Sequence, residues 1–96
     1  TIYCDLNNSI KKTDIINLLK ELDKINPFLK YIENDETLDF FSIQNSNYCK
    51  IKVFDHYSDD KLIIVSAIDN LIKGAAGQAV QCFNIAENIE ETVSLV

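Results

Sequence analysis

Few side chains in this 96-residue chain could do chemistry: three cysteines, one histidine and one glycine-containing segment. The cysteines, Cys4, Cys49 and Cys82, are odd in number and lack CxxC spacing, which predicts reduced thiols rather than a disulfide framework. His56 stands at no usual zinc-ligand spacing from them, so we expect no metal site. We expect His56 in a solvated turn, Cys49 in the core and Cys82 packed on a helix.

The two glycines of the chain, Gly74 and Gly77, both lie in the run DNLIKGAAGQA at positions 69–79. Glycine inside a helix costs about 1 kcal/mol relative to alanine, so two glycines about one turn apart need a reason. That reason is usually close approach by a ligand, another backbone or another helix. Asp69 or Asn70 can cap the start of this helix, whose free N–H groups suit an anion or an amide oxygen. The residues alone leave two alternatives open: contact with a ligand, or tight helix–sheet packing with a polar cap.

Hydrophobic periodicity predicts the elements that position this segment. We expect a strand over residues 1–5, then an amphipathic helix with Thr13 as its N-cap that stops at Asn26-Pro27. The apolar stripe of this helix comprises Ile15, Leu18, Leu19, Leu22 and Ile25, and its charged residues Lys20, Glu21, Asp23 and Lys24 lie mostly off the stripe.

Further strands and a second helix follow. A short strand is expected over 28–32, and residues 38–43 are a strand or an extended loop. Alternation over 48–55 and a β-branched run over 61–68 predict an antiparallel hairpin. A helix is predicted over 70–87, with Asn88 in the left-handed conformation just past its end.

Composition bounds the class of protein. We predict one domain over 1–96, of the α+β class, with a mixed, largely antiparallel sheet and helices on one face. The net charge of −6 and scattered basic residues argue against a nucleic-acid partner. No apolar run is long enough for a membrane helix, and no signal peptide is visible, so we expect a cytoplasmic protein. The missing initiator Met favours a piece of a longer chain.

The segment 67–84 resembles the DNLxKGAxGQAxQ signature that enters the final helix of N-acetyl-γ-glutamyl-phosphate reductases. Three shorter matches follow the same order: TIY at 1–3, SNYC at 46–49 and ET at 91–92. The resemblance therefore covers essentially the whole chain. Asn45, Asn88 and Ser94 stand where the family commonly has glycine, and asparagine tolerates the left-handed backbone that such positions need.

The resemblance implies a fold like the C-terminal domain of glyceraldehyde-3-phosphate dehydrogenase. It also implies an activity: a cysteine thiolate attacks an acyl phosphate, and hydride from NADPH reduces the resulting thioester to a semialdehyde, with a histidine as acid/base. None of the cysteines here, nor His56, matches the family's catalytic positions, so this chain alone should be inactive. The resemblance places most of the NADP site in an upstream dinucleotide-binding domain.

The resemblance also implies roles for individual residues. Asn70 could bind the nicotinamide carboxamide, Gly74 and Gly77 would let the helix pass close to the cofactor, and Lys73 could neutralise the substrate's phosphate. Plain capping by Asn70 and a solvated Lys73 are the alternatives. Gln78 and Gln81 could form hydrogen bonds across a domain or subunit contact.

The resemblance predicts two protein partners. The terminal helix over 69–88 would contact the cofactor domain, and the sheet would form a homo-oligomer interface with Phe40, Phe41, Tyr48 and Phe54 near its surface. Aromatic residues that simply fill a small core are the alternative.

Two other functions compete with the reductase. The chain could be a stand-alone, non-catalytic dimerisation or regulatory module, or the matching domain of a related semialdehyde dehydrogenase such as aspartate-semialdehyde dehydrogenase.

Overall fold

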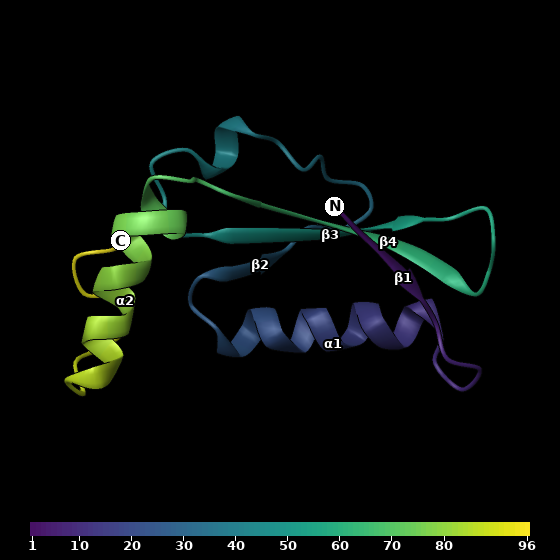
Figure 1. The fold of residues 1–96 in the computed structure, drawn as a ribbon, viewed down its shortest axis with the longest axis horizontal. Helices are drawn as coiled ribbons and strands as arrows, with labels where there is room; N and C mark the ends of the chain where they lie inside the picture. Colours follow the sequence, from purple (N-terminus) through teal and green to yellow (C-terminus); the bar gives the residue numbers. More distant parts are fainter.

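Four strands form one mixed sheet with a hairpin at its centre (Figure 1). The computed structural model describes all 96 residues. The strand order is β1-β4-β3-β2, in which β1 (Ile2–Asp5), β4 (Lys61–Ile68) and β3 (Cys49–Asp55) are antiparallel neighbours and β2 (Leu29–Tyr31) runs parallel to β3. The predicted hairpin and the mixed, largely antiparallel sheet are therefore confirmed.

Helix α1 (Lys12–Ile25) covers one face of this sheet (Figure 1). The first helical residue is Lys12, and the N-cap is Lys11, two residues before the predicted cap Thr13. The backbone N–H of Lys11 donates to Asp14 Oδ2 at 2.8 Å. The prediction of Thr13 as N-cap was therefore wrong, because the carboxylate of Asp14 reaches back to close the first turn. The helix ends at Asn26, which is extended as expected before a proline.

The core lies between α1 and the sheet. Its buried centre is Tyr31, Val53 and Leu62, at 7%, 1% and 1% exposure, and each such side chain contributes roughly 1.5–3 kcal/mol by burial. Partly buried apolar residues pack around it: Cys4, Leu6, Ile15, Ile16, Leu19 and Ile64. Two members of the predicted stripe, Leu18 and Ile25, are exposed instead.

The opposite face of the sheet is covered in part by the loop over 33–46 (Figure 1). The buried Lys52 Nζ donates to the backbone oxygens of Asn34 and Glu36, and Lys50 Nζ donates to Ser42 Oγ at 2.9 Å. The loop contains one 3-10 turn, η1 (Phe41–Ile43), so residues 38–43 form no strand.

The chain after β4 leaves the sheet at its end (Figure 1). A π-helical turn, η2 (Ile72–Ala76), leads directly into α2 (Gly77–Ala86), and α2 packs mainly on η2 rather than on the strands. The expectation that both helices lie on one sheet face therefore holds only for α1. Neither helix combines the length and the hydrophobicity needed to cross a bilayer.

Three non-glycine residues have positive φ: Asn45 at 57°, Asn88 at 57° and Ser94 at 65°. These are the three positions at which the resembled family commonly has glycine. Here asparagine or serine adopts the left-handed conformation that glycine favours. Asn88 ends α2 as predicted. Its N–H donates to Ile85 O at 3.2 Å and the N–H of Ile89 donates to Asn84 O at 2.8 Å, the two bonds of a Schellman cap.

Candidate functional site

Asp69 joins the turn after β4 to the turn before β3. Its Oδ1 accepts the backbone N–H groups of Leu71 at 2.8 Å and Ile72 at 3.1 Å, and its Oδ2 accepts the N–H of Asn45 at 2.8 Å. These bonds, from Asn45 first and then Leu71, lower the pKa of the Asp69 carboxyl below its ordinary value. Of the two predicted caps, Asp69 is the one that closes the turn.

The segment predicted as a plain helix begins with a wider turn. The N–H of Gly74 donates to Asp69 O at 3.0 Å and the N–H of Ala76 donates to Leu71 O at 3.2 Å, so these bonds span five residues instead of four. π-helical turns are rare, and many lie at functional sites. The candidate site of this chain is therefore built on η2.

Both glycines of the segment make room for asparagine side chains of the same chain. A Cβ on Gly74 would lie 3.1 Å from Asn70 Oδ1. A Cβ on the buried Gly77 would lie 2.7 Å from the backbone oxygen of Ile72, 2.8 Å from its Cγ2, and closer still to Asn47 Oδ1. The close approach inferred from sequence thus includes an internal partner, and Asn47, buried at 1% exposure, was not among the candidates.

Asn70 presents an unused carboxamide at the surface. Its side chain is exposed and makes no hydrogen bond within the chain. It lies on the wall of a hollow of about 250 Å³ whose other walls come from the 33–46 loop and from the end of β4. The lining residues are Phe40, Ile43, Gln44, Ile68, Asp69, Asn70 and Leu71. An amide donor and an amide acceptor are both free there to bind a ligand.

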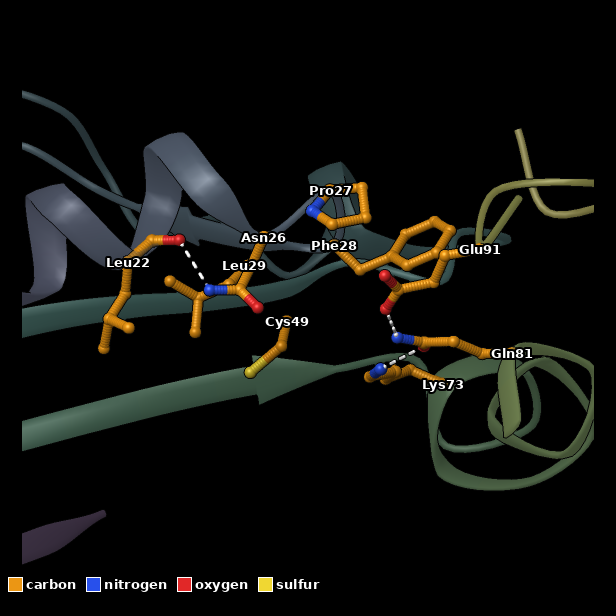
Figure 2. A pocket seen from close by; sticks show the side chains of 9 residues that line it. All are labelled: Leu22, Asn26, Pro27, Phe28, Leu29, Cys49, Lys73, Gln81 and Glu91. Carbon is orange, nitrogen blue, oxygen red and sulfur yellow. Dashed lines mark hydrogen bonds between the residues drawn. The ribbon is translucent and has the colours of Figure 1, made fainter. Parts of the chain in front are cut away.

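Lys73 points into a different hollow, of about 340 Å³, on the side of α1 and β2 (Figure 2). Its Nζ donates to Gln81 Oε1 at 2.6 Å and lies 5.7 Å from the centre of the Phe28 ring. No carboxylate pairs with it. The structure therefore does not bring Lys73 and Asn70 together in one pocket.

Of the cysteines and the histidine, Cys49 shares a hollow with the η2 residue Lys73. Cys49 lines the Lys73 hollow, half-buried, and burial raises the pKa of its thiol while the charge of Lys73 opposes this shift. Cys82 is exposed, which corrects the expectation of a packed helix residue, because α2 has no sheet beside it. His56 lies in the β3–β4 turn as predicted and is half-buried, with Nδ1 accepting the N–H of Ser58 at 3.0 Å.

Gln81 was given no role by sequence reasoning beyond a contact with another domain or subunit. In the structure its carboxamide contacts Asn47, Lys73 and Glu91, three segments of its own chain. Lys73 and Gln81 are eight residues apart, a spacing that a regular helix pattern would not pair.

Comparison with known proteins places the chain in a family. The family described as "semialdehyde dehydrogenase, dimerisation domain" matches residues 1–70, from β1 to the turn at Asn70. The chain belongs to the semialdehyde dehydrogenase dimerisation-domain family. In this family member, η2 and α2 lie beyond the matched residues.

Similar proteins match nearly the full length of the chain. It is 43% identical over 96 residues to the N-acetyl-gamma-glutamyl-phosphate reductase of Brachyspira hyodysenteriae, covering 99% of this chain and 27% of that protein. The reductases of Methanosphaera stadtmanae and Ehrlichia chaffeensis are 39% and 37% identical, covering 94% and 99% of this chain and 26% and 27% of theirs. The chain thus spans about a quarter of the length of these curated relatives.

The two glycines should differ in their tolerance of alanine. Gly77→Ala should lower the free energy of unfolding by about 2 kcal/mol, because the new methyl group meets the Ile72 backbone and the buried Asn47. Gly74→Ala should stay within about 1 kcal/mol of the original, because Asn70 can shift and alanine favours the helix. Urea denaturation of both variants checks this, and equal losses for the two would contradict it.

Proposed function

We propose that this chain is the C-terminal part of an NADPH-dependent N-acetyl-γ-glutamyl-phosphate reductase, an enzyme that converts an acyl phosphate to a semialdehyde in arginine biosynthesis. The observation that carries this proposal is similarity over nearly the whole chain, 43% identical in one case, to reductases with that name. The protein would be cytoplasmic. The catalytic cysteine and histidine and most of the NADP site would come from upstream residues, so residues 1–96 would be inactive alone.

The part of this chain in the reaction would be to bind and orient the cofactor. Bound NADPH would supply the hydride that brings the acyl group to the aldehyde level. Asn70 fits the nicotinamide carboxamide because its own carboxamide is exposed and unpaired on a turn that Asp69 fixes. Gly74, which has no side chain, would let the nicotinamide ring approach the turn closely. Gly77 would leave room for the Asn47 side chain, which packs against the start of α2.

Lys73 is the proposed contact for the phosphate of the substrate. Its ammonium has three N–H donors, one of which is used by Gln81, and no carboxylate neutralises it. Because Asn70 and Lys73 face separate hollows, they would serve different ligands or different parts of one ligand.

The domain arrangement would follow the fold of the C-terminal domain of glyceraldehyde-3-phosphate dehydrogenase. Residues 1–96 would act as a single domain, and residues 69–88 would contact the dinucleotide-binding domain. Apolar side chains of α2 support this, since Val80, Phe83 and Ile85 are 36%, 60% and 56% exposed.

A second copy of the protein would cover the open part of the sheet. On the face away from α1, Tyr3 and Phe54 flank Ile63, and Val65 follows on β4. Tyr3 and Phe54 are 75% and 40% exposed, and Phe40 and Phe41, on the loop over the same face, are 65% and 76% exposed. The fourth aromatic residue of the expected interface, Tyr48, instead packs against Phe28 at 5.9 Å between ring centres.

Asn70→Ala in the complete gene product should raise the KM for NADPH about tenfold, because lost amide hydrogen bonds cost roughly 1–1.5 kcal/mol. The assay follows NADPH oxidation with N-acetylglutamyl phosphate as substrate. Asn8→Ala, in the exposed turn after β1, is the matched control and should leave the KM unchanged. An inactive complete protein would refute the reductase, and an unchanged KM for Asn70→Ala would remove Asn70 from the cofactor site.

Val65→Lys in the complete protein should convert a dimer to a monomer, since the new charge would be buried against the partner's sheet. Leu18→Lys, on the outer side of α1 where Leu18 is 56% exposed, is the control and should keep the dimer. Light scattering measures the mass. A dimer that persists in Val65→Lys but is lost in Leu18→Lys would place the interface on α1 instead.

A further inference from the structure

Gln81 on α2 is the meeting point of three segments. Its Oε1 accepts a hydrogen bond from Lys73 Nζ at 2.6 Å, and its Nε2 donates to Glu91 Oε1 at 2.6 Å (Figure 2). The same Oε1 also accepts a hydrogen bond from Asn47 Nδ2 at 2.9 Å. One carboxamide therefore ties η2 to the turn before β3 and to the C-terminal tail.

The amide also separates two opposite charges. Neither Lys73 nor Glu91 forms an ion pair with any other side chain, so each has Gln81 as its polar side-chain partner. The oxygen of Gln81 faces the cation and its N–H faces the anion. Hydrogen bonds to charged groups contribute roughly 1.5–3 kcal/mol, so this arrangement holds the carboxamide in one orientation.

The π-helical turn is what lets Lys73 reach Gln81. In a regular α-helix, residues eight apart differ by about 80° around the axis. A π-helical turn holds more residues per turn and therefore rotates less for each residue. Four of the eight steps from Lys73 to Gln81 start within η2, so the two side chains come closer to one face of the helix.

We propose that Gln81 is a positioning residue that fixes the η2 turn for the cofactor, an inference that rests on the proposed reductase function. The turn is held at two points: Asp69 by the backbone of Asn45, and Lys73 by Gln81. Asn70 lies between these points, with Oδ1 packed against Gly74, the neighbour of Lys73. Gln81 thus sets where the free carboxamide of Asn70 is presented, without touching the cofactor.

Gln81→Leu in the complete protein should raise the KM for NADPH about tenfold and change kcat less than threefold. Leucine keeps much of the side-chain volume and removes all three hydrogen bonds. Asn17→Leu is the control, since Asn17 is an exposed amide on α1, outside the proposed contact with the cofactor domain, and both constants should stay unchanged. A KM within twofold of the original for Gln81→Leu would overturn the proposal.

An exchanged pair separates positioning from simple stability. Gln81→Glu alone keeps the acceptor for Lys73 but faces Glu91 with a second carboxylate, so the KM should rise as in Gln81→Leu. Adding Glu91→Gln reverses the original hydrogen bond: the new amide at position 91 donates to the new carboxylate at position 81. The KM for NADPH should then return to within twofold of the original. If the double variant folds with an unchanged Tm but keeps the raised KM, the proposal is wrong.

Hydrogen exchange gives a readout that does not need activity. In Gln81→Leu, the amides of Gly74 and Ala76 should exchange about tenfold faster, and the exchanged pair should restore their protection. Faster exchange in a protein with no reductase activity would support the positioning role and refute the proposed function. Unchanged exchange in an active enzyme would overturn the positioning role and leave the function standing.

Discussion

The buried carboxamide of Asn47 against Gly77 is the contact on which the arrangement beyond the sheet depends. It places the turn before β3 directly on the first residue of α2, and the Nδ2 of the same side chain donates to Gln81. Asp69 adds a second link, from the turn after β4 to the turn before β3, through the N–H of Asn45. With these links, α2 can leave the end of the sheet and still have a defined direction, although it scarcely touches the strands.

The elements with strong local signals could be predicted from sequence. Alternation identified β3, since it is typical of a strand with one buried face, and the nearly continuous β-branched run identified β4. Asn26-Pro27 marked the end of α1 because proline keeps the preceding residue out of the helical region, and Asn88 marked the end of α2 because asparagine tolerates the left-handed conformation. The special character of the segment from 69 to 79 was also visible, since its glycines are the only two in the chain.

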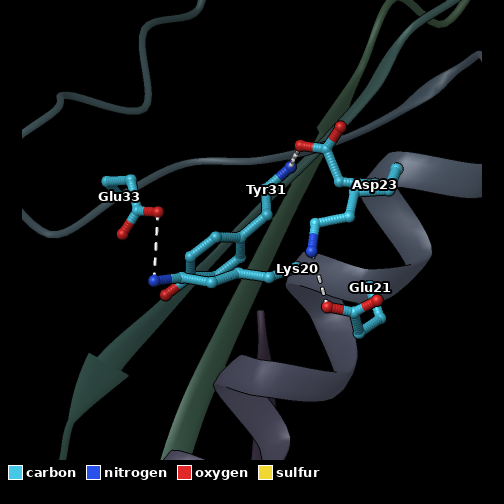
Figure 3. Close-up of polar contacts among 6 residues, drawn as sticks. Lys20, Glu21, Asp23, Tyr31 and Glu33 are labelled. Carbon is cyan, nitrogen blue, oxygen red and sulfur yellow. Dashed lines mark hydrogen bonds and ion pairs between the residues drawn. The ribbon is translucent and has the colours of Figure 1, made fainter.

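Features that depend on long-range polar contacts could not be predicted. Asp23 was expected to lie off the apolar stripe with its charged neighbours, yet its carboxylate accepts the backbone N–H of Tyr31 at 2.8 Å and fixes β2 beside α1 (Figure 3). Asn47, which donates to Gln81 and occupies the space above Gly77, lies 34 positions from the first and 30 from the second. No pattern in the sequence pairs such residues. The π-helical turn of η2 was not predicted either, and the segment was expected to be a regular helix.

A double-mutant cycle between Asn47 and Gly77 tests this central contact most directly. The free energies of opening of η2 and α2 would be read from native-state hydrogen exchange for Asn47→Ala, Gly77→Ala and the double variant. Removal of the Asn47 carboxamide should relieve part of the clash, so Gly77→Ala should cost at least about 1 kcal/mol less in the Asn47→Ala background. Additive costs of the two changes would contradict the account.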